Sequence, residues 1–282
     1  MTPLPGLLRT LPLAHRGLHD PGAGIAENSL AAVRAAMDAG YGIELDLQPS
    51  QDGVAMVFHD DDLDRLTAAT GPVRARHAAE LSALPLTGDP GTIPRFAEVL
   101  ALVAGAVPLL VEIKSQPGDP RTATLPLVEA ALADLAGYAG PLALMSFNPF
   151  AVAHGARLRP DLAWGVTTGH GEPLWPDDPD LDRRLIQSAI DPRDWGGSFV
   201  SHGLWDAGAP WLPALAAAGV DILSWTIRSP ADEARARRYA GNITFEGYRP
   251  ARPSEPAAYQ GERVDRASQP PLPLDRCGAE TT

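Results

Sequence analysis

Short apolar runs alternate along this sequence with longer segments rich in Ala, Leu and Arg, and this alternation limits the chain to few folds. It is typical of β/α units, in which each strand is followed by a helix that packs on the sheet. Predicted strands cover residues 11–16, 42–48, 54–60, 107–114, 141–147, 162–167, 198–203, 220–227 and 242–246. Predicted helices cover residues 29–39, 94–104, 123–136, 149–157, 210–218 and 230–239.

The chain length helps to choose between the main folds built from β/α units. The chain has 282 residues, of which 45% are apolar, enough for one large barrel or two ordinary domains. A doubly wound dinucleotide fold would carry a Gly-rich fingerprint after its first strand, and none follows residues 11–16. The sequence therefore predicts an α/β fold, a (β/α)8 TIM-type barrel. Because such a barrel holds eight strands, at least one predicted strand is surplus.

Two segments differ in composition from the predicted barrel, which we expect to span residues 1–249. Residues 61–93 are polar with Gly and Pro interruptions, so they are predicted to form a small excursion between barrel units. Residues 250–282 contain six prolines and little apolar periodicity. This composition predicts a tail that wraps the surface or stays disordered.

The composition also narrows the possible partners and locations. The net charge of −12 argues against nucleic acid, because phosphate backbones reward clustered Lys and Arg. No run of about 18 apolar residues exists, so no transmembrane segment is expected. The Pro-broken N-terminus is a poor signal peptide, so the expected location is the cytoplasm. The single cysteine, Cys277, excludes an intrachain disulfide and a cysteine zinc cluster, and nothing in the sequence indicates an oligomeric state.

Two predicted strands carry carboxylates on a face that a barrel would turn inward. Glu44 and Asp46 share one face of the second predicted strand, and Glu112 and Lys114 share one face of the fourth, near its C-terminal end. Three buried carboxylates need compensation and suit a hard cation such as Mg²⁺ or Ca²⁺. Lys114, the only lysine, can hold a phosphate oxygen beside them. A solvated edge strand and a simple Glu–Lys pair remain alternative interpretations of the two strands.

Two histidines are predicted to approach these carboxylates. His15 ends the first predicted strand and His59 ends the third. The turn at residues 50–53 is too short for a parallel crossover, so the strands on either side of it are predicted to form a hairpin. If that four-residue turn closes the hairpin, Glu44 pairs with His59 at roughly 5 Å. The expected register therefore places His59 beside Glu44 and the metal.

Two imidazoles beside a metal-held phosphodiester suit general acid–base catalysis, because their pKa values lie near neutrality. One takes a proton from the nucleophile and the other gives a proton to the leaving alkoxide. Arg16, next to His15, can clamp a phosphate bidentately. A single histidine at a strand end is more often structural, so the interpretation depends on both His15 and His59 reaching the acidic strands.

The ordered set of short motifs resembles the glycerophosphodiester phosphodiesterase family, a phospholipase C-like group of phosphodiesterase barrels. Each motif is weak alone, but the order and approximate spacing are specific, and the resemblance runs through residues 11–247. The motifs are HRG at 15–17, EN at 27–28, ELD at 44–46, DG at 52–53, HD at 59–60, EIK at 112–114 and SWTI at 224–227.

The resemblance implies a role for each of these site residues. Glu44, Asp46 and Glu112 would be ligands of one divalent metal ion, Mg²⁺ or Ca²⁺, with Mn²⁺ as a further possibility. The implied acid–base pair is His15 with His59, and the implied phosphate-binding residues are Arg16 and Lys114. The implied reaction, part of lipid and glycerol metabolism, releases an alcohol and sn-glycerol 3-phosphate. Related enzymes use the neighbouring glycerol hydroxyl as nucleophile, through a cyclic phosphate that water opens.

Four further residues are open to two interpretations each. Glu27 and Asn28 match the family's EN pair, but Asn28 is also an ordinary N-cap candidate for the first helix. Trp225 is expected to form an apolar wall for the glycerol, or else to fill the core. Phe147 either lines the same pocket or belongs to the core.

The sequence departs from the family after the last strand. Many members have a Thr-Asp step there, whereas this chain has ITFEGYRP at 243–250, so Glu246 is the candidate substitute. Two other functions stay open: a phosphodiester lyase that leaves a cyclic product, and a silent phosphate-binding barrel. The latter would require a missing catalytic residue. Loops determine substrate choice in such barrels, so the alcohol moiety is not predicted.

Overall fold

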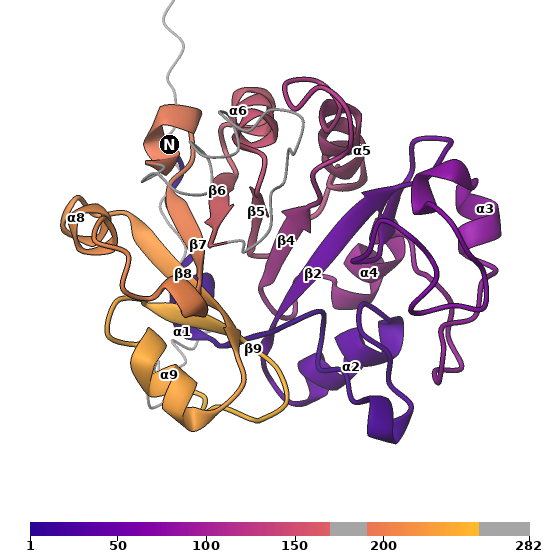
Figure 1. The fold of residues 1–282 in the computed structure, drawn as a ribbon, viewed down its shortest axis with the longest axis horizontal. Helices are drawn as coiled ribbons and strands as arrows, with labels where there is room; N and C mark the ends of the chain where they lie inside the picture. The colour runs from indigo at the N-terminus through magenta and orange to yellow at the C-terminus, as the bar shows by residue number, and fades with distance from the viewer. Residues whose placement is uncertain (170–190, 254–282) are drawn as a thin grey trace, which may run out of the picture. The chain divides into compact units, whose positions relative to one another are not determined.

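Eight parallel strands close into a barrel in this computed structural model, which describes residues 1–169 and 191–253 (Figure 1). The ring order is β1-β9-β8-β7-β6-β5-β4-β2, and β1 also pairs with β2, which closes it. The predicted (β/α)8 TIM-type barrel is therefore confirmed. The strands are β1 (Leu13–Ala14), β2 (Gly42–Pro49), β4 (Leu109–Ile113), β5 (Leu142–Ser146), β6 (Ala163–Thr168), β7 (Phe199–Gly203), β8 (Asp221–Ile227) and β9 (Asn242–Phe245).

The surplus strand is β3 (Ala55–Val57), which pairs with β2 antiparallel and lies outside the ring of eight. The predicted hairpin therefore exists, but its register is shifted by one residue. Pro49 pairs with Ala55, and the amide of Ser50 donates to the carbonyl of Val54 (2.9 Å), so the turn has three residues instead of the predicted four. The amide of Gly53 donates to the carbonyl of Ser50 (3.1 Å), and Gly53 tolerates the required left-handed φ of 79°.

This shift makes the predicted pairing of Glu44 with His59 wrong. In the observed register the partner of residue 59 would be Leu45, and β3 ends before that point is reached. The amide of Phe58 still donates to the carbonyl of Asp46 (3.0 Å), after which the chain bends away from β2. His59 therefore enters the site from a bend after β3, where it contributes to lowering the pKa of Asp46.

Helices surround the barrel and cover the apolar outer face of its strands (Figure 1). Ile43, Leu45 and Leu47 of β2 are fully buried in this layer, as the alternation in their strand predicted. All six predicted helices are present, and within the described residues α1 and α3 are additional α-helices. The helices are α1 (Gly6–Thr10), α2 (Leu30–Asp38), α3 (Ala78–Leu81), α4 (Phe96–Val103), α5 (Leu125–Asp134), α6 (Pro149–Leu158), α8 (Leu212–Ala217) and α9 (Pro230–Ala236).

The inside of the barrel has an apolar part and a polar part. Leu8 of α1 packs with Leu13, Leu110 and Phe199 from the strands, in one buried cluster. Asn242 fixes α1 there, because its side-chain amide donates to the carbonyl of Leu8 (2.9 Å). Glu112 of β4 lies near the C-terminal end of its strand, where barrel active sites lie.

Residues 61–93 contain α3 and more apolar packing than their polar composition predicted. Leu63, Leu81 and Ile93 form a buried cluster with Met56 and Phe58 of the hairpin. This cluster anchors the excursion beside β3. Within residues 1–169 and 191–253, no helix is long and apolar enough to cross a membrane. The predicted tail, from residue 254 onward, lies outside the described residues.

Candidate active site

Three buried carboxylates from two neighbouring strands form an acidic cluster. Glu44 and Asp46 project from β2, and Glu112 projects from β4, where it is paired with Asp46. One oxygen of each carboxylate lies within 4.8 Å of the others. Since oxygen ligands at this spacing suit a hard divalent cation, the cluster is able to bind a metal.

The cationic groups near the cluster act unequally on the pKa values of its carboxylates. Burial and then repulsion by Asp46 and Glu112 raise the pKa of Glu44 well above its usual value. Burial alone would raise the pKa of Asp46 too, but the charges of Lys114, His59 and Arg16 outweigh it and lower that pKa. The ammonium of Lys114 lies 3.2 Å from Asp46 and 3.0 Å from Glu112. One ammonium thus serves two carboxylates, whereas the nearest cationic side chain of Glu44 within the described residues is His15, whose Nε2 lies 4.0 Å away.

Arg16 lies over the acidic cluster in a left-handed backbone conformation, with φ at 55°. Its amide donates to Glu44 (3.1 Å) and its Nη1 donates to Glu27 (2.7 Å). Its Nε is buried 3.6 Å from Asp46 and has no hydrogen-bond partner in the described part of the chain. This N–H therefore faces the carboxylate of Asp46, and Arg16 is one of the residues that line the cavity.

Asn28 serves the acidic cluster and does not cap the helix. Its Nδ2 donates to the carboxylate of Asp46 (2.9 Å), and its Oδ1 accepts from the amide of Asp46 (3.3 Å). The N-cap of α2 is Ser29, whose hydroxyl accepts from the amide of Ala32 (3.1 Å). Ser29 therefore caps the helix, and Asn28 orients the carboxylate of Asp46.

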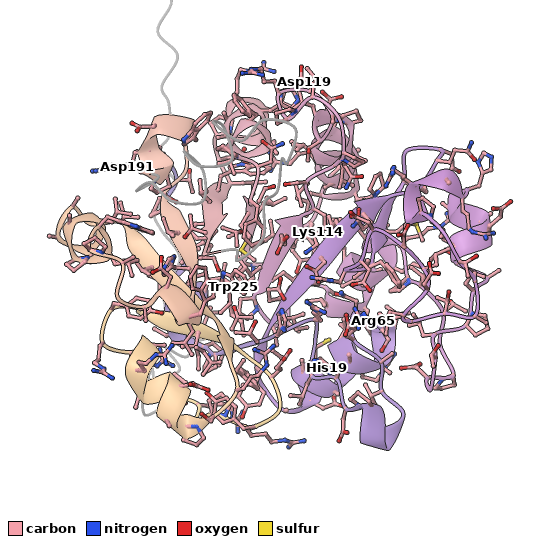
Figure 2. All side chains as sticks on the ribbon, in the orientation of Figure 1. His19, Arg65, Lys114, Asp119, Asp191 and Trp225 are labelled. Atoms are coloured by element: carbon pink, nitrogen blue, oxygen red, sulfur yellow. The ribbon has the colours of Figure 1, made fainter. Side chains whose placement is uncertain are left out.

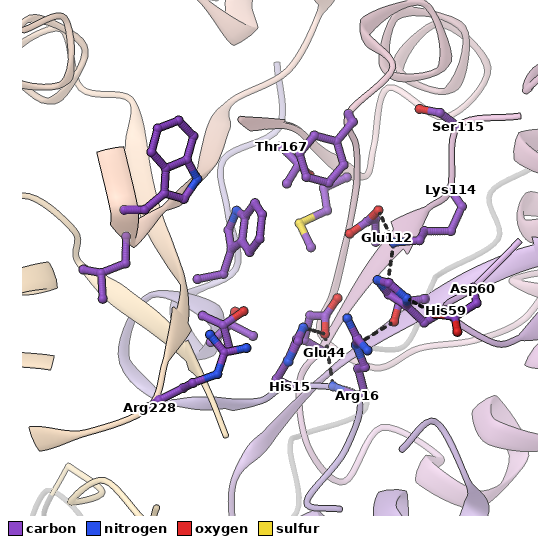
Figure 3. A pocket seen from close by; sticks show the side chains of 18 of the residues that line it. His15, Arg16, Glu44, His59, Asp60, Glu112, Lys114, Ser115, Thr167 and Arg228 are labelled. Atoms are coloured by element: carbon purple, nitrogen blue, oxygen red, sulfur yellow. Dashed lines mark hydrogen bonds and ion pairs between the residues drawn. The ribbon is translucent and has the colours of Figure 1, made fainter. Parts of the chain in front are cut away.

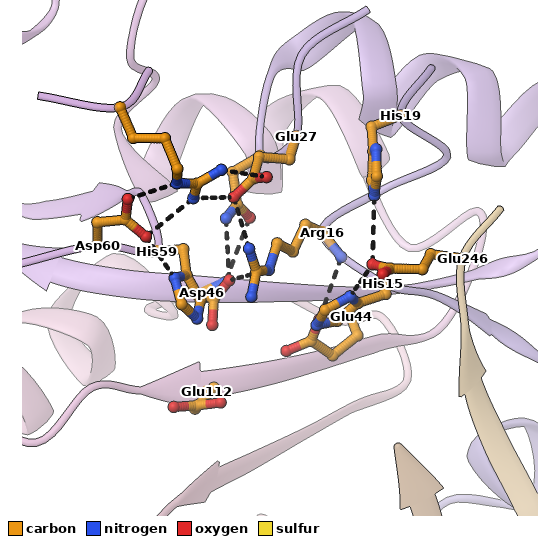
Figure 4. A network of polar contacts seen from close by, with 12 residues as sticks. His15, Arg16, His19, Glu27, Glu44, Asp46, His59, Asp60, Glu112 and Glu246 are labelled. Atoms are coloured by element: carbon orange, nitrogen blue, oxygen red, sulfur yellow. Dashed lines mark hydrogen bonds and ion pairs between the residues drawn. The ribbon is translucent and has the colours of Figure 1, made fainter. Parts of the chain in front are cut away.

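Each of the two histidines is held by a carboxylate at its Nδ1 atom (Figure 4). His15 Nδ1 lies 2.5 Å from Glu246, and His59 Nδ1 lies 2.7 Å from Asp60. A hydrogen bond from Nδ1–H to a carboxylate fixes the tautomer and leaves Nε2 for other partners. Burial lowers the pKa of His15, although the hydrogen bond to Glu246 opposes this effect.

Glu246 occupies the place where the sequence departs from the family pattern. Besides His15, it accepts two contacts of 2.7 Å from the guanidinium of Arg228. Burial alone would raise the pKa of Glu246, but its hydrogen bond to His15 and its contact with His19 at 3.6 Å outweigh burial and lower that pKa. The motif comparison pointed to Glu246 only as a candidate substitute, and it gave no signal for its partner Arg228.

The predicted site residues, with the exception of Asn28, line one cavity of about 770 Å³ (Figure 3). Lys114 and Trp225 lie near the middle of the barrel in Figure 2, whereas Asp119 and Asp191 lie at its periphery. Trp225 donates from its indole N–H to the carbonyl of Ser201 (3.1 Å). The cavity has a charged wall and an apolar wall. The charged wall carries His15, Arg16, Glu44, Asp46, His59, Glu112 and Lys114, and the apolar wall carries Met145, Phe147, Leu204, Trp205 and Trp225.

Comparison with known proteins agrees with this arrangement. Residues 15–242 match the glycerophosphoryl diester phosphodiesterase family, which is most of the chain. The chain belongs to this family. The name of the glycerophosphoryl diester phosphodiesterase family denotes phosphoric diester hydrolases, and the match ends before Glu246.

Individual family members are similar over parts or most of the chain. A glycerophosphodiester phosphodiesterase of Caldanaerobacter subterraneus subsp. tengcongensis is 36% identical over 113 residues, which are 40% of this chain and 42% of that protein. The chain therefore matches less than half the length of this relative.

Two solved structures share the barrel over most of the chain. A candidate glycerophosphoryl diester phosphodiesterase of Silicibacter pomeroyi DSS-3 has a TM-score of 0.70 and 25% identity, covering 84% of this chain and 89% of that one. A phosphodiesterase of Oleispira antarctica, in complex with the product sn-glycerol-3-phosphate, has a TM-score of 0.67 and 24% identity, covering 83% and 93%. The latter likeness concerns the fold.

Proposed function

We propose that the protein is a metal-dependent phosphodiesterase that hydrolyses glycerophosphodiesters to an alcohol and sn-glycerol 3-phosphate. The observation that carries the proposal is the meeting of three buried carboxylates, two carboxylate-held histidines and two cationic side chains in one cavity. The product in the Oleispira antarctica structure supports this choice of substrate. A cytoplasmic role in lipid and glycerol metabolism is part of the proposal.

The charged wall carries groups that can bind a metal ion and groups that can bind the phosphoryl group of the substrate. Glu44, Asp46 and Glu112 would hold one divalent cation, Mg²⁺ or Ca²⁺, with Mn²⁺ as a further candidate. When bound, the cation would neutralise charge on the phosphoryl group. Arg16 and Lys114, which both line the cavity, would bind the phosphate oxygens through their guanidinium and ammonium groups.

The two histidines would move the protons. Burial lowers the pKa of His15, so its imidazole is neutral near pH 7 and suits the general base, which accepts a proton at Nε2 from the attacking hydroxyl. His59, on the Asp46 side of the cavity, would donate a proton to the leaving alkoxide as the attacking glycerol hydroxyl forms a cyclic phosphate, which water then opens to sn-glycerol 3-phosphate. Trp225 would form the apolar wall for the glycerol carbons, with its ring edge-on to Phe147 at 5.6 Å.

Alanine substitution of each histidine tests the proposal. His15→Ala and His59→Ala should each lower kcat by about 100-fold or more, because each removes a proton-transfer group. The matched control is His154→Ala, since His154 on α6 pairs with Glu129 away from the cavity. Circular dichroism should show that all three variants are folded. Near-wild-type turnover in His15→Ala or His59→Ala would remove the acid–base assignment.

Phosphorus NMR of the products distinguishes hydrolysis from cyclisation. Glycerophosphocholine, glycerophosphoethanolamine and glycerophosphoglycerol would be incubated with the protein and Mg²⁺, Ca²⁺ or Mn²⁺. We expect released glycerol 3-phosphate, and reversible loss of activity on adding a chelator. A cyclic phosphate as final product would favour the lyase alternative, and no turnover of any substrate would favour the silent barrel.

A further inference from the structure

Arg65 lies just behind the charged wall and holds two carboxylates at once (Figure 2). Its Nη1 and Nη2 donate to the two oxygens of Glu27 at 2.9 and 2.8 Å. Its Nε and Nη2 donate to the two oxygens of Asp60 at 2.6 and 2.8 Å. Both contacts are bidentate, the geometry in which a guanidinium orients a carboxylate most firmly.

Each of these carboxylates in turn holds a side chain of the charged wall (Figure 4). Glu27 accepts from the guanidinium of Arg16 at 2.7 Å. Asp60 lies 2.7 Å from Nδ1 of His59. Arg65 is therefore one hydrogen-bonded step behind both Arg16 and His59, while it does not itself line the cavity.

We propose that Arg65 is a positioning residue that fixes the phosphate-binding Arg16 and the acid–base His59 relative to each other. The proposal rests on the roles given to Arg16 and His59 under the proposed function. Without Arg65, Glu27 would keep only Arg16 among these partners, and Asp60 only His59. Both carboxylates could then rotate, and the two side chains would lose their common anchor.

The alternative is that Arg65 only tethers residues 61–93 to the barrel. Its side chain is 47% exposed, and ion pairs at such exposure add little to stability. A tether would affect the amount of folded protein and leave the kinetic constants of the folded molecules unchanged. A positioning residue would affect the kinetic constants, because small misplacements of reacting groups are costly.

The first experiment compares Arg65→Met with Arg65→Lys and with the control Arg74→Met. Arg74 belongs to the same excursion and is exposed, and its side chain makes no hydrogen bond within the described residues. With glycerophosphodiester and saturating metal, Arg65→Met should lower kcat about 10- to 100-fold and raise KM severalfold. Arg65→Lys should recover little, since an ammonium cannot form two bidentate contacts. Arg74→Met should match the wild type.

The second experiment separates the two arms by double-mutant cycles. Glu27→Gln should act mainly on KM through Arg16, and Asp60→Asn mainly on kcat through His59. When either change is combined with Arg65→Met, the loss of kcat/KM should be at least about fivefold smaller than the product of the two single losses. The reason is that both changes break the same chain of contacts. Additive effects in both cycles would overturn the proposal.

The outcomes also separate this inference from the proposed function. If His59→Ala is inactive while Arg65→Met has wild-type kcat and KM, only the positioning role is wrong. If His59→Ala keeps its activity, the acid–base role of His59 in the proposed function is wrong, whatever the kinetic constants of Arg65→Met. A lower melting temperature of Arg65→Met with unchanged kinetic constants would identify a tether and overturn the positioning role.

Discussion

The carboxyl group of Glu44 has an unfavourable environment in the metal-free protein and a favourable one beside a cation. Its relative exposure is 2%, and two other carboxylates surround it. A buried set of like charges destabilises the fold unless it is compensated. Such a set is therefore retained where function requires it. The acidic cluster should therefore couple metal binding to stability.

The substitution Glu44→Gln tests this coupling. The pKa of Glu44 is raised in the folded state, so its contribution favours folding below the unfolded value near 4.5 and is lost as pH rises through the folded pKa. In a chelator at pH 8, Glu44→Gln should therefore melt at least about 2 °C above the wild type, and the gain should vanish near pH 4. Excess Mg²⁺ or Ca²⁺ should reverse the order, because only the wild type keeps all three carboxylates.

The control for this experiment is Glu129→Gln, an exposed position on α5 far from the acidic cluster. It should leave the response to metal and chelator unchanged. A melting temperature of Glu44→Gln below that of the wild type in chelator at pH 8 would show that Glu44 is not an uncompensated charge.

The role of a site residue could be predicted from the sequence where the residue type and its strand position alone limit its chemistry. Glu44 and Asp46 alternate with apolar neighbours, so their shared inward face followed from strand geometry. The part played by Asn28 depends on a left-handed φ of 57°, which no local pattern predicts. Arg65 gave no signal, because its partners are 38 and 5 residues away in the sequence and meet only in the folded chain.

At the level of helices and strands, hydrophobic patterning was sufficient to predict the elements and insufficient for their register. The hairpin of β2 and β3 is the clearest case. The tight turn excluded a parallel crossover, but the choice between a three- and a four-residue turn depends on Gly53 and on backbone hydrogen bonds. A shift of one residue changes every cross-strand neighbour, and the predicted place of His59 was wrong for this reason.

Helix α6 contains a glycine whose replacement by Ala should destabilise the protein. A Cβ at Gly155 would lie 2.1 Å from the ring of Trp164 in β6, a side chain that is 1% exposed. Although Ala is favoured in helices by about 1 kcal/mol, the clash should lower the free energy of unfolding by about 1–3 kcal/mol. Urea denaturation measures the change.

The matched control is Gly6→Ala in α1, where an added Cβ meets no atom within 4 Å. It should change the free energy of unfolding by less than about 0.5 kcal/mol. If Gly155→Ala were as stable as Gly6→Ala, the packing of α6 on Trp164 would be looser than the structure shows.

For the molecule as a whole, the net charge of −12 opposes the approach of an anionic substrate. Glycerophosphoglycerol carries a net negative charge, whereas glycerophosphocholine is zwitterionic and neutral overall. Salt screens long-range repulsion, with a Debye length of about 10 Å at 0.1 M. The ratio of kcat/KM for glycerophosphoglycerol to that for glycerophosphocholine should therefore rise about twofold or more between 0.02 and 0.2 M salt.

Glycerophosphocholine serves as the internal control, since effects of salt on folding or metal binding cancel in the ratio. A ratio that falls with salt would show that the cationic side chains of the charged wall, Arg16 and Lys114, determine the field that the substrate meets.

The contact between His15 and Glu246 joins the segments that follow the first and the last strand of the barrel, which are 231 residues apart in the sequence. During synthesis from the N-terminus, the three carboxylates and both histidines have all been made by residue 112. The carboxylate that orients His15 arrives only with the segment after β9, whose pairing with β1 closes the ring. A nascent chain therefore carries the proposed reactive groups long before Glu246 can orient His15, and the proposed site is complete only when the barrel closes.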